Sequence, residues 1–390
     1  MTSQGNIPLS VPHIEGNEWE YLKECLDTNW VSSAGKFVTR FEEDLADFVG
    51  AKRGVAVING TAALHTALMI AGVQQDDEVL VSSLTFVAPA NAIRYTGAWP
   101  VFIDADPDYW QMDPECVREF LDERCETRDS RLFNKNTGRR VKAIIPVHIL
   151  GHPCDMDPIM DLARKYGLTV IEDATESLGA KYKGQMVGNI GDIGCFSFNG
   201  NKLLTTGGGG MVVTNEEKWA DRASYLTNQA KDDPLEYIHG EIGYNYRLTN
   251  IQAAMGCAQM ERIDDYIQAK LAIAAAYTEY FDGVPGLTPM SQAPWAESVF
   301  WMFTALIDEG EFGMDSRQLL RALDEQGIQT RPLWQPCHES PAHPNSESQI
   351  NGSASSIHRQ ALSLPCSVGL PQEDQERVLR TISSLGNSAT

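Results

Sequence analysis

Seven short apolar runs, rich in valine and isoleucine, lie between residues 54 and 215 and alternate with helical patterns. Several have no polar residue at alternate positions, which is typical of strands buried on both faces of a parallel sheet. They predict a large α/β domain with a seven-stranded, mostly parallel sheet covered by helices. The runs are GVAVIN (54–59), EVLVSS (78–83), PVFIDA (100–105), VKAIIPVHI (141–149), LTVIEDA (168–174), IGCFSF (193–198) and MVVTN (211–215).

The remaining sequence predicts a smaller second unit. A long amphipathic helix is expected over residues 249–281, followed by a strand-like run at 299–307. Because 390 residues suit two or three domains, we expect a large domain over residues 1–260 and a smaller C-terminal α+β domain over residues 261–390.

Two polar segments interrupt these patterns. Residues 122–140 are charged and contain an Asn-Thr-Gly turn at 136–138, so we expect a surface hairpin inserted before a core strand. Residues 340–356, SPAHPNSESQINGSASS, predict a polar loop.

Composition excludes several classes of partner. Lysine and arginine total 31 against 53 aspartates and glutamates, so the net charge of −22 repels nucleic acid and anionic lipid. No apolar run is long enough to span a membrane, and the N-terminus has no signal-peptide pattern. Eight cysteines occur singly, without a C-x-x-C pair, which is typical of free thiols in a reducing cytoplasm. We expect a cytoplasmic protein with no membrane partner, no nucleic-acid partner and no metal site.

The first predicted strand leads into a turn that suits a phosphate better than a dinucleotide. A dinucleotide-binding fold needs G-x-G-x-x-G at this point, whereas the chain has NGTAAL at 59–64. A strand, this turn and a following helix still offer free backbone N–H groups and a positive helix end to a phosphate. An ordinary strand–turn–helix connection explains the same residues.

Two further segments carry residues that could react. Glu172 and Asp173 close a buried strand, where α/β proteins bind ligands, and a buried carboxylate needs a cation such as a protonated pyridine nitrogen. Lys202 follows another strand and precedes the glycine run 207–210, where its amine could form a Schiff base with an aldehyde. Ser197 could donate its hydroxyl to a phosphate. The alternatives are a helix N-cap at Asp173 and a surface loop at Lys202.

Together these features match the needs of one cofactor. A phosphate cup, an aromatic side chain at Phe86 that could stack on a ring, an acid and a lysine are what an enzyme offers to pyridoxal 5′-phosphate (PLP). We therefore predict PLP as the cofactor.

The chain resembles the DegT/DnrJ/EryC1/StrS sugar aminotransferase family over essentially its full length. Within the family, the inserted hairpin and phrases such as FSFNGNK look most like the aminotransferase of the legionaminic acid pathway. The matching stretches include NGTAALHTAL, EVLVSSLTFVAPANAI, PVHILGHPCDMDPI, VIEDATESLGAKYKG, NKLLTTGGGGMVVT and GYNYRLTNIQAAMG.

The resemblance implies roles for the cofactor-contacting residues. Lys202 matches the catalytic lysine that binds PLP and then moves a proton, and Asp173 matches the partner of the ring nitrogen. Asn245 matches a residue that reaches the phosphate from the neighbouring subunit, which implies a homodimer with its active sites at the subunit interface. The implied cofactor contacts are Gly60, Thr61, Ala62, Phe86, Asp173, Glu176, Ser197 and Asn245.

Two positions depart from the family pattern. Asn199 stands where the family usually has histidine, and Glu176 stands where it often has glutamine beside the phenolic oxygen of the cofactor. A carboxylate there would repel a phenolate unless one of them holds a proton. Lys202 is retained, whereas relatives that dehydrate sugars have histidine in its place.

The resemblance also suggests residues that contact the substrate. Arg331 could hold a diphosphate, Trp334 could stack and His338 could donate to the sugar, and each could equally be a surface or packing residue. Arg247 is a candidate for a dimer or carboxylate contact, and His148 faces either the cofactor edge or the core. The candidate substrate residues are Trp30, His148, Arg247, Arg331, Trp334 and His338.

The family implies an aspartate aminotransferase fold (fold type I) and a two-step transamination. We expect L-glutamate to donate its amino group to C4 of a nucleotide-linked 4-keto-6-deoxy-N-acetylhexosamine, carried by UDP or GDP. The product would enter a surface glycan of the legionaminic acid or bacillosamine type. The alternatives are another keto sugar, either perosamine-type or 3-keto, and a PLP-bearing protein without turnover.

Overall fold

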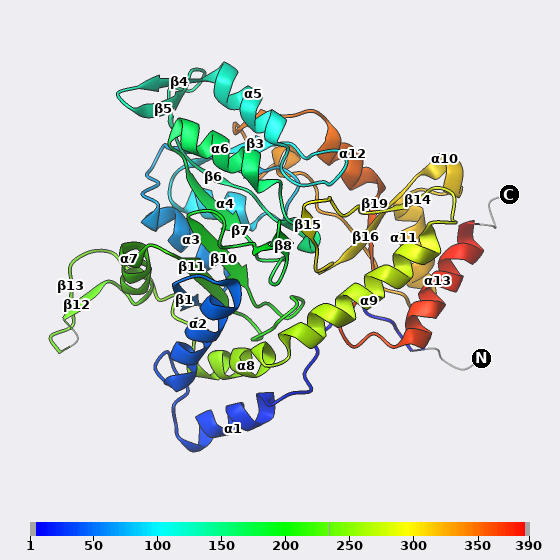
Figure 1. The fold of residues 1–390 in the computed structure, drawn as a ribbon, viewed down its shortest axis with the longest axis horizontal. Coiled ribbons are helices and arrows are strands. Elements are labelled where there is room, and N and C mark those ends of the chain that lie inside the picture. Colours follow the sequence, from blue (N-terminus) through cyan, green and yellow to red (C-terminus); the bar gives the residue numbers. More distant parts are fainter. Residues whose placement is uncertain (1–4, 234, 387–390) are drawn as a thin grey trace.

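The computed structural model describes residues 5–233 and 235–386 and is built around one large sheet. All seven predicted strands are present (Figure 1). In the strand order given below, β11 runs antiparallel to the strands on both sides of it, β1 and β10. The order is β1 (Arg53–Val57), β11 (Gly210–Thr214), β10 (Ile193–Ser197), β7 (Thr169–Asp173), β6 (Arg140–Ile145), β2 (Glu78–Ser82), β3 (Trp99–Ile103) and β18 (Glu347–Gln349).

Strand β18 corrects the prediction of a polar loop over 340–356. It pairs in parallel with β3 at the edge of the sheet, and α12 (Ser353–Gln360) follows it. The strand is short and polar because it lies at an edge and is half-buried, so it carries no apolar pattern.

Helices cover both faces of the sheet, as Figure 1 shows. Alternate residues of β2 belong to different apolar cores: Val79 and Val81 face one core and Leu80 faces the other. The helices of this part of the chain are α1 (Glu18–Asp27), α2 (Lys36–Val49), α3 (Gly60–Ile70), α4 (Ala88–Tyr95), α5 (Pro114–Arg124), α6 (Met156–Tyr166), α7 (Glu217–Thr227) and α8 (Asn250–Met260).

The long helix predicted over residues 249–281 is wrong as a single element. The chain forms α8 and then α9 (Ile263–Phe281), with a break at Glu261 and Arg262. Glu261 is held by the side chains of Tyr21 and Arg40, and α8 packs against α1 and α2. Helix α9 instead runs to the C-terminal sheet (Figure 1), so the two halves bury different faces.

The C-terminal part forms a second, antiparallel sheet of four strands. Its order is β14 (Leu287–Pro289), β16 (Phe303–Ile307), β19 (Ala361–Leu364) and β17 (Arg331–Pro332). The boundary at residues 260/261 stays a prediction. The helices here are α10 (Glu309–Phe312), α11 (Ser316–Glu325), α12 and α13 (Gln372–Gly386).

The predicted hairpin is present with a different turn. Strands β4 (Cys125–Arg128) and β5 (Arg131–Asn134) are joined at Asp129 and Ser130, both with positive φ. The Asn-Thr-Gly turn at 136–138 instead connects β5 to β6, which pair antiparallel. The remaining short elements are β8 (Lys181–Tyr182), β9 (Gln185–Met186), β12 (Lys231–Asp233), β13 (Ile238–His239), β15 (Ala296–Glu297), η1 (Ile149–Gly151) and η2 (Cys337–Glu339).

The structure also bears on the expected free cysteines and on the expected lack of a membrane-spanning segment. All eight cysteines are free and buried. Within the two described stretches, every helix is too short or too polar to cross a membrane.

Candidate active site

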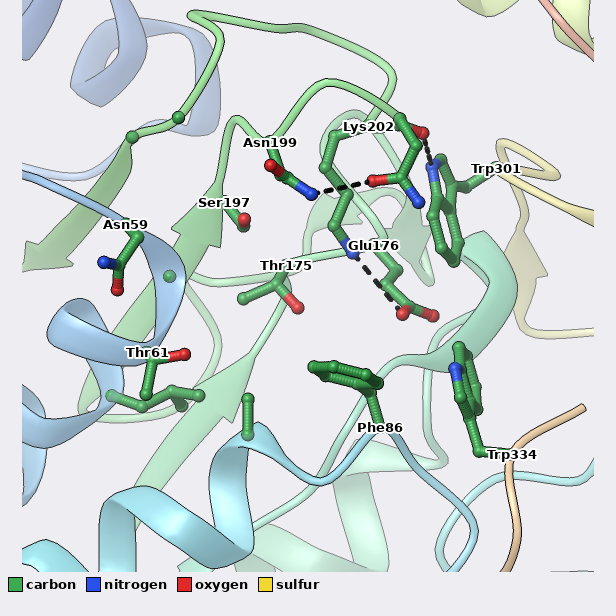
Figure 2. A pocket seen from close by; sticks show the side chains of 16 residues that line it. Asn59, Thr61, Phe86, Thr175, Glu176, Ser197, Asn199, Lys202, Trp301 and Trp334 are labelled. Atoms are coloured by element: carbon green, nitrogen blue, oxygen red, sulfur yellow. Dashed lines mark hydrogen bonds and ion pairs between the residues drawn. The ribbon is translucent and has the colours of Figure 1, made fainter. Parts of the chain in front are cut away.

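A pocket of about 270 Å³ lies at the carboxyl ends of β7 and β10, against the N-terminus of α3 (Figure 2). This is the edge where parallel α/β sheets bind ligands. Its wall includes seven of the predicted site residues: Gly60, Thr61, Phe86, Glu176, Ser197, Lys202 and Trp334. The other lining residues are Asn59, Leu64, Ala88, Thr175, Asn199, Asn201, Gly208, Gly209 and Trp301.

One end of the pocket is formed by the first turn of α3. The N–H groups of a first helical turn have no partner within the helix, and the helix end carries a partial positive charge. Ser197 lies so close that a Cβ on Gly60 would be 2.8 Å from the Ser197 Cβ, so the position requires glycine. With the hydroxyls of Thr61 and Ser197, this turn can hold a phosphate.

The backbone N–H of Ala62, expected to reach the phosphate, has another partner here. It donates to the side-chain oxygen of Asn59, 2.8 Å away, which caps the helix. Asn59 was not predicted as a site residue, although an Asn before Gly-Thr-Ala is an N-cap signal.

Lys202 and Glu176 form an ion pair inside the pocket. The Lys202 Nζ lies 3.4 Å from the Glu176 Oε1, and the two side chains are 14% and 5% exposed. The backbone N–H of Leu150 donates to the other Glu176 oxygen at 2.9 Å. Burial raises the pKa of Glu176, and the charge of Lys202 opposes this shift. The carboxylate therefore holds the lysine amine at the centre of the pocket (Figure 2).

Asp173 is a buried carboxylate with little compensation. It is 2% exposed at the end of β7, and the Thr175 N–H donates to its Oδ1 at 3.1 Å. Across residues 5–233 and 235–386, no ion pair includes it. Burial raises its pKa, and Thr175 and Lys202 act in the opposite direction. A cationic ring nitrogen would supply the missing partner.

Glu172, the neighbouring acid, has a structural role. It faces the other side of β7, where its carboxylate accepts N–H bonds from Gly188, Ile190 and Gly191 at 2.6–2.8 Å. His148 lies 2.9 Å from it and is fully buried. The Cys154 N–H donates to the other nitrogen of this imidazole, so His148 is satisfied within the core and does not line the pocket.

Aromatic side chains form the opposite wall. Phe86 is 54% exposed although it is apolar, and its ring faces the pocket (Figure 2). A flat ligand ring stacked on it would cover this surface. Trp334 and Trp301 extend the wall, and Trp301 was not predicted because no local pattern marks it.

Five other predicted residues lie outside this pocket. Trp30 is 57% exposed and lines a separate cleft with Lys36 and Asn250. Asn245 is exposed, and Arg247 forms a 2.8 Å ion pair with Glu42. The exposed Arg331 donates to its neighbour Thr330, and the imidazole of His338 bonds the hydroxyl of Ser83 at 2.5 Å.

The residues present fit PLP. The helix end suits a phosphate, the exposed Phe86 face suits a ring, and the buried Asp173 forms no ion pair in the described part of the chain. Lys202 offers a primary amine between these groups.

Comparisons with known proteins point to the same class. The model of the DegT/DnrJ/EryC1/StrS aminotransferase family matches residues 12–383. The chain is 38% identical over 386 residues to the GDP-perosamine synthase of Caulobacter vibrioides, covering 99% of this chain and 100% of that one.

Solved structures are similar over nearly the whole chain. DesV of S. venezuelae, in complex with a ketimine intermediate, has 29% identity and a TM-score of 0.86, covering 98% and 99% of the two chains. The PLP form of Spr1654 from Streptococcus pneumoniae shares the fold, with 23% identity, a TM-score of 0.87 and coverage of 99% and 100%.

Proposed function

The chain belongs to the DegT/DnrJ/EryC1/StrS aminotransferase family and is a PLP-dependent sugar aminotransferase. From this premise we propose that it transfers the amino group of L-glutamate to the C4 ketone of a nucleotide-linked 4-keto-6-deoxyhexose. The observation that carries the proposal is the Lys202–Glu176 pair in a pocket that is also lined by the first turn of α3. We place the reaction in the cytoplasm, where the eight free thiols stay reduced.

The proposed mechanism divides the work among a few residues. Bound PLP would supply the aldehyde that takes up the amine and the ring that stores an electron pair. The first turn of α3 and the hydroxyls of Thr61 and Ser197 would hold its phosphate, and Phe86 would offer its face to the ring. Asp173 would keep the ring nitrogen protonated.

Lys202 acts as the acid and base. Its Nζ takes a proton from the substrate carbon in one half of the reaction and returns one in the other. Glu176, 3.4 Å away, keeps this amine directed into the pocket.

Two sugars are candidates for the acceptor. The segment FSFNGNK resembles the aminotransferase of the legionaminic acid pathway. This resemblance favours the 4-keto-6-deoxy-N-acetylhexosamine as the acceptor, with a product that enters a glycan of the legionaminic acid or bacillosamine type. The relative from Caulobacter vibrioides is a GDP-perosamine synthase, which supports GDP-linked 4-keto-6-deoxymannose as the second candidate. The amide groups of Asn199 and Asn201, joined by a 3.3 Å hydrogen bond at the pocket, could contact either sugar.

We also propose a homodimer that shares its active sites. The hairpin of β12 and β13 and the segment that follows it expose apolar side chains, with Leu235 at 86%, Tyr237 at 68%, Ile238 at 54% and Ile242 at 84%. In Figure 1 this hairpin projects from the body of the molecule. Exposed apolar patches of this kind mark interfaces, and a second copy could bring Asn245 to the phosphate, as the family resemblance suggests.

Absorbance spectroscopy provides the first test. Purified protein with PLP should absorb near the visible edge, and L-glutamate should move this band to the ultraviolet. The amine-loaded protein is then given UDP-linked acetamido 4-keto sugar and GDP-linked 4-keto-6-deoxymannose in turn, with NMR of the product. An amine at C3, or no response to glutamate, would contradict the proposal.

A further inference from the structure

Trp301 contacts the reactive lysine in two ways. Its ring centroid lies 4.1 Å from the Lys202 Nζ. Its indole N–H donates to the carbonyl oxygen of Asn201, the residue before Lys202, at 2.7 Å. Trp301 is 3% exposed and lines the pocket beside Lys202 (Figure 2). The indole therefore touches both the amine and the backbone that carries it.

The segment before Trp301 is held in a strained conformation. Phe300 has a φ of 45°, which is unfavourable for a bulky residue. The Ser298 hydroxyl and the Val299 N–H both donate to the Gly151 carbonyl oxygen, at 2.9 and 3.0 Å. A Cβ on Gly151 would lie 2.6 Å from the backbone nitrogen of Trp301, so glycine is required for the two backbone segments to come this close. Strain of this kind persists only where several contacts impose it, and it concentrates at functional sites.

A buried lysine fixes the same segment from the other side. Lys270 in α9 is 2% exposed, and its Nζ donates to the Trp301 carbonyl oxygen at 2.8 Å and also to the Cys366 carbonyl oxygen. A buried ammonium is costly to desolvate. Its placement on two backbone carbonyls therefore ties the Trp301 backbone to α9 and to the end of β19.

We infer that Trp301 is a positioning residue for Lys202. Its ring contacts the Lys202 Nζ at 4.1 Å, and the Glu176 carboxylate contacts the same Nζ at 3.4 Å. The ring attracts the charged ammonium through its π face. The inference rests on the proposed function, in which Lys202 alternates between ammonium and amine. The C-terminal part of the chain thus positions the reactive amine.

Reductive methylation of the cofactor-free protein tests this role. Formaldehyde with cyanoborohydride modifies only the neutral amine, and peptide mass spectrometry reports the rate at Lys202 over a range of pH. Trp301→Leu removes the ring, and Trp301→Phe keeps a weaker one. We expect the pH midpoint of modification to be highest in the wild type, lower in Trp301→Phe and lowest in Trp301→Leu. At a fixed pH below the midpoint, the modification rate should therefore rise by about 2- to 30-fold.

Matched controls separate this effect from unfolding. Trp334→Phe changes a tryptophan farther along the same wall (Figure 2) and should leave the Lys202 profile unchanged. The exposed Lys218 should react equally in every variant. An unchanged Lys202 profile in Trp301→Leu would overturn the inference. A rate that rises equally at all pH values would overturn it too, because the ring would then only shield the amine.

The loaded enzyme gives an independent readout. With PLP and L-glutamate, Trp301→Phe should lower kcat more than it changes KM, since the ring acts on the lysine and not on substrate binding. A wild-type protein that fails to respond to glutamate would refute the proposed function alone, because the methylation profile is measured without cofactor. An active wild type with identical profiles in all variants would refute the role of Trp301 alone.

Discussion

Asp173→Asn should stabilise the cofactor-free protein while weakening its affinity for PLP. An ionised carboxylate buried without a cation costs several kcal/mol. Asp173 accepts the Thr175 N–H at 3.1 Å, and such a bond to a charged group returns about 1.5–3 kcal/mol. The amide of asparagine removes the charge, so we expect the free energy of unfolding at pH 8 to rise by about 1–3 kcal/mol. For a chain of this length, this gain in the free energy of unfolding raises the melting temperature of the variant above that of the wild type by about 1–4 °C.

The raised pKa of Asp173 determines how the stability difference between Asp173→Asn and the wild type changes with pH. Burial raises the pKa of Asp173 above its usual 3.8. A group with a raised pKa adds stability below its unfolded pKa and loses that contribution as pH rises through the folded pKa. The melting-temperature difference between variant and wild type should therefore be small in acid and should widen towards pH 8.

Asp104→Asn is the matched control. Asp104 is also a fully buried aspartate after a strand, but it accepts four backbone N–H groups at 2.7–2.9 Å, from Ala105, Asn351, Gly352 and Ala354. Its replacement should lower the free energy of unfolding by about 2–3 kcal/mol.

Affinity for PLP provides the second measurement on Asp173→Asn. Loss of the charged partner of the ring nitrogen should weaken binding by about 10- to 150-fold, measured by fluorescence titration. A cofactor-free variant that melts below wild type at pH 8, with a difference that does not depend on pH, would refute the reasoning.

Three other changes test the site and the assembly. Lys202→Ala should abolish amination of the sugar while keeping some PLP binding, so appreciable product by NMR would contradict its role as acid and base. Glu176→Gln should lower the free energy of unfolding of the cofactor-free protein by about 1–3 kcal/mol in urea titrations, because it leaves the Lys202 ammonium unpaired. It should keep measurable turnover, since the family often has glutamine there. Ile242→Asp, at an 84% exposed position just after the β12–β13 hairpin, should yield monomers by light scattering, whereas a variant that stays dimeric would exclude this exposed apolar segment from the interface.

The strand-end residues show how far local sequence patterns reach. A buried strand that ends in two acids indicated a ligand site, and strand alternation places Glu172 and Asp173 on opposite faces. The pattern does not say which face is the pocket. That choice depends on Gly188, Ile190 and Gly191, whose N–H groups satisfy Glu172 and leave Asp173 for a ligand.

Residues that act from a distance left no local signal. Trp301 reaches Lys202 because a strained turn and a buried lysine place it there, and neither is visible as a motif. The helix break at Glu261 depends on partners from α1 and α2. The Ala62 amide depends on its immediate neighbours instead, because its N–H donates to the side chain of the N-cap residue Asn59.

The charges around the pocket explain why a ligand such as PLP suits so acidic a chain. Lys202 is the only lysine or arginine among the described residues that line the pocket, and it is paired with Glu176. The phosphate must therefore be bound by the dipole and N–H groups of α3 and by hydroxyls, which do not add a positive side chain. Asp173, buried at the end of β7, offers the opposite polarity, because it forms no ion pair among the described residues and the charge of Lys202 only opposes the effect of burial on its pKa. A ligand that is anionic at one end and cationic at its ring matches both ends, although the chain carries a net charge of −22.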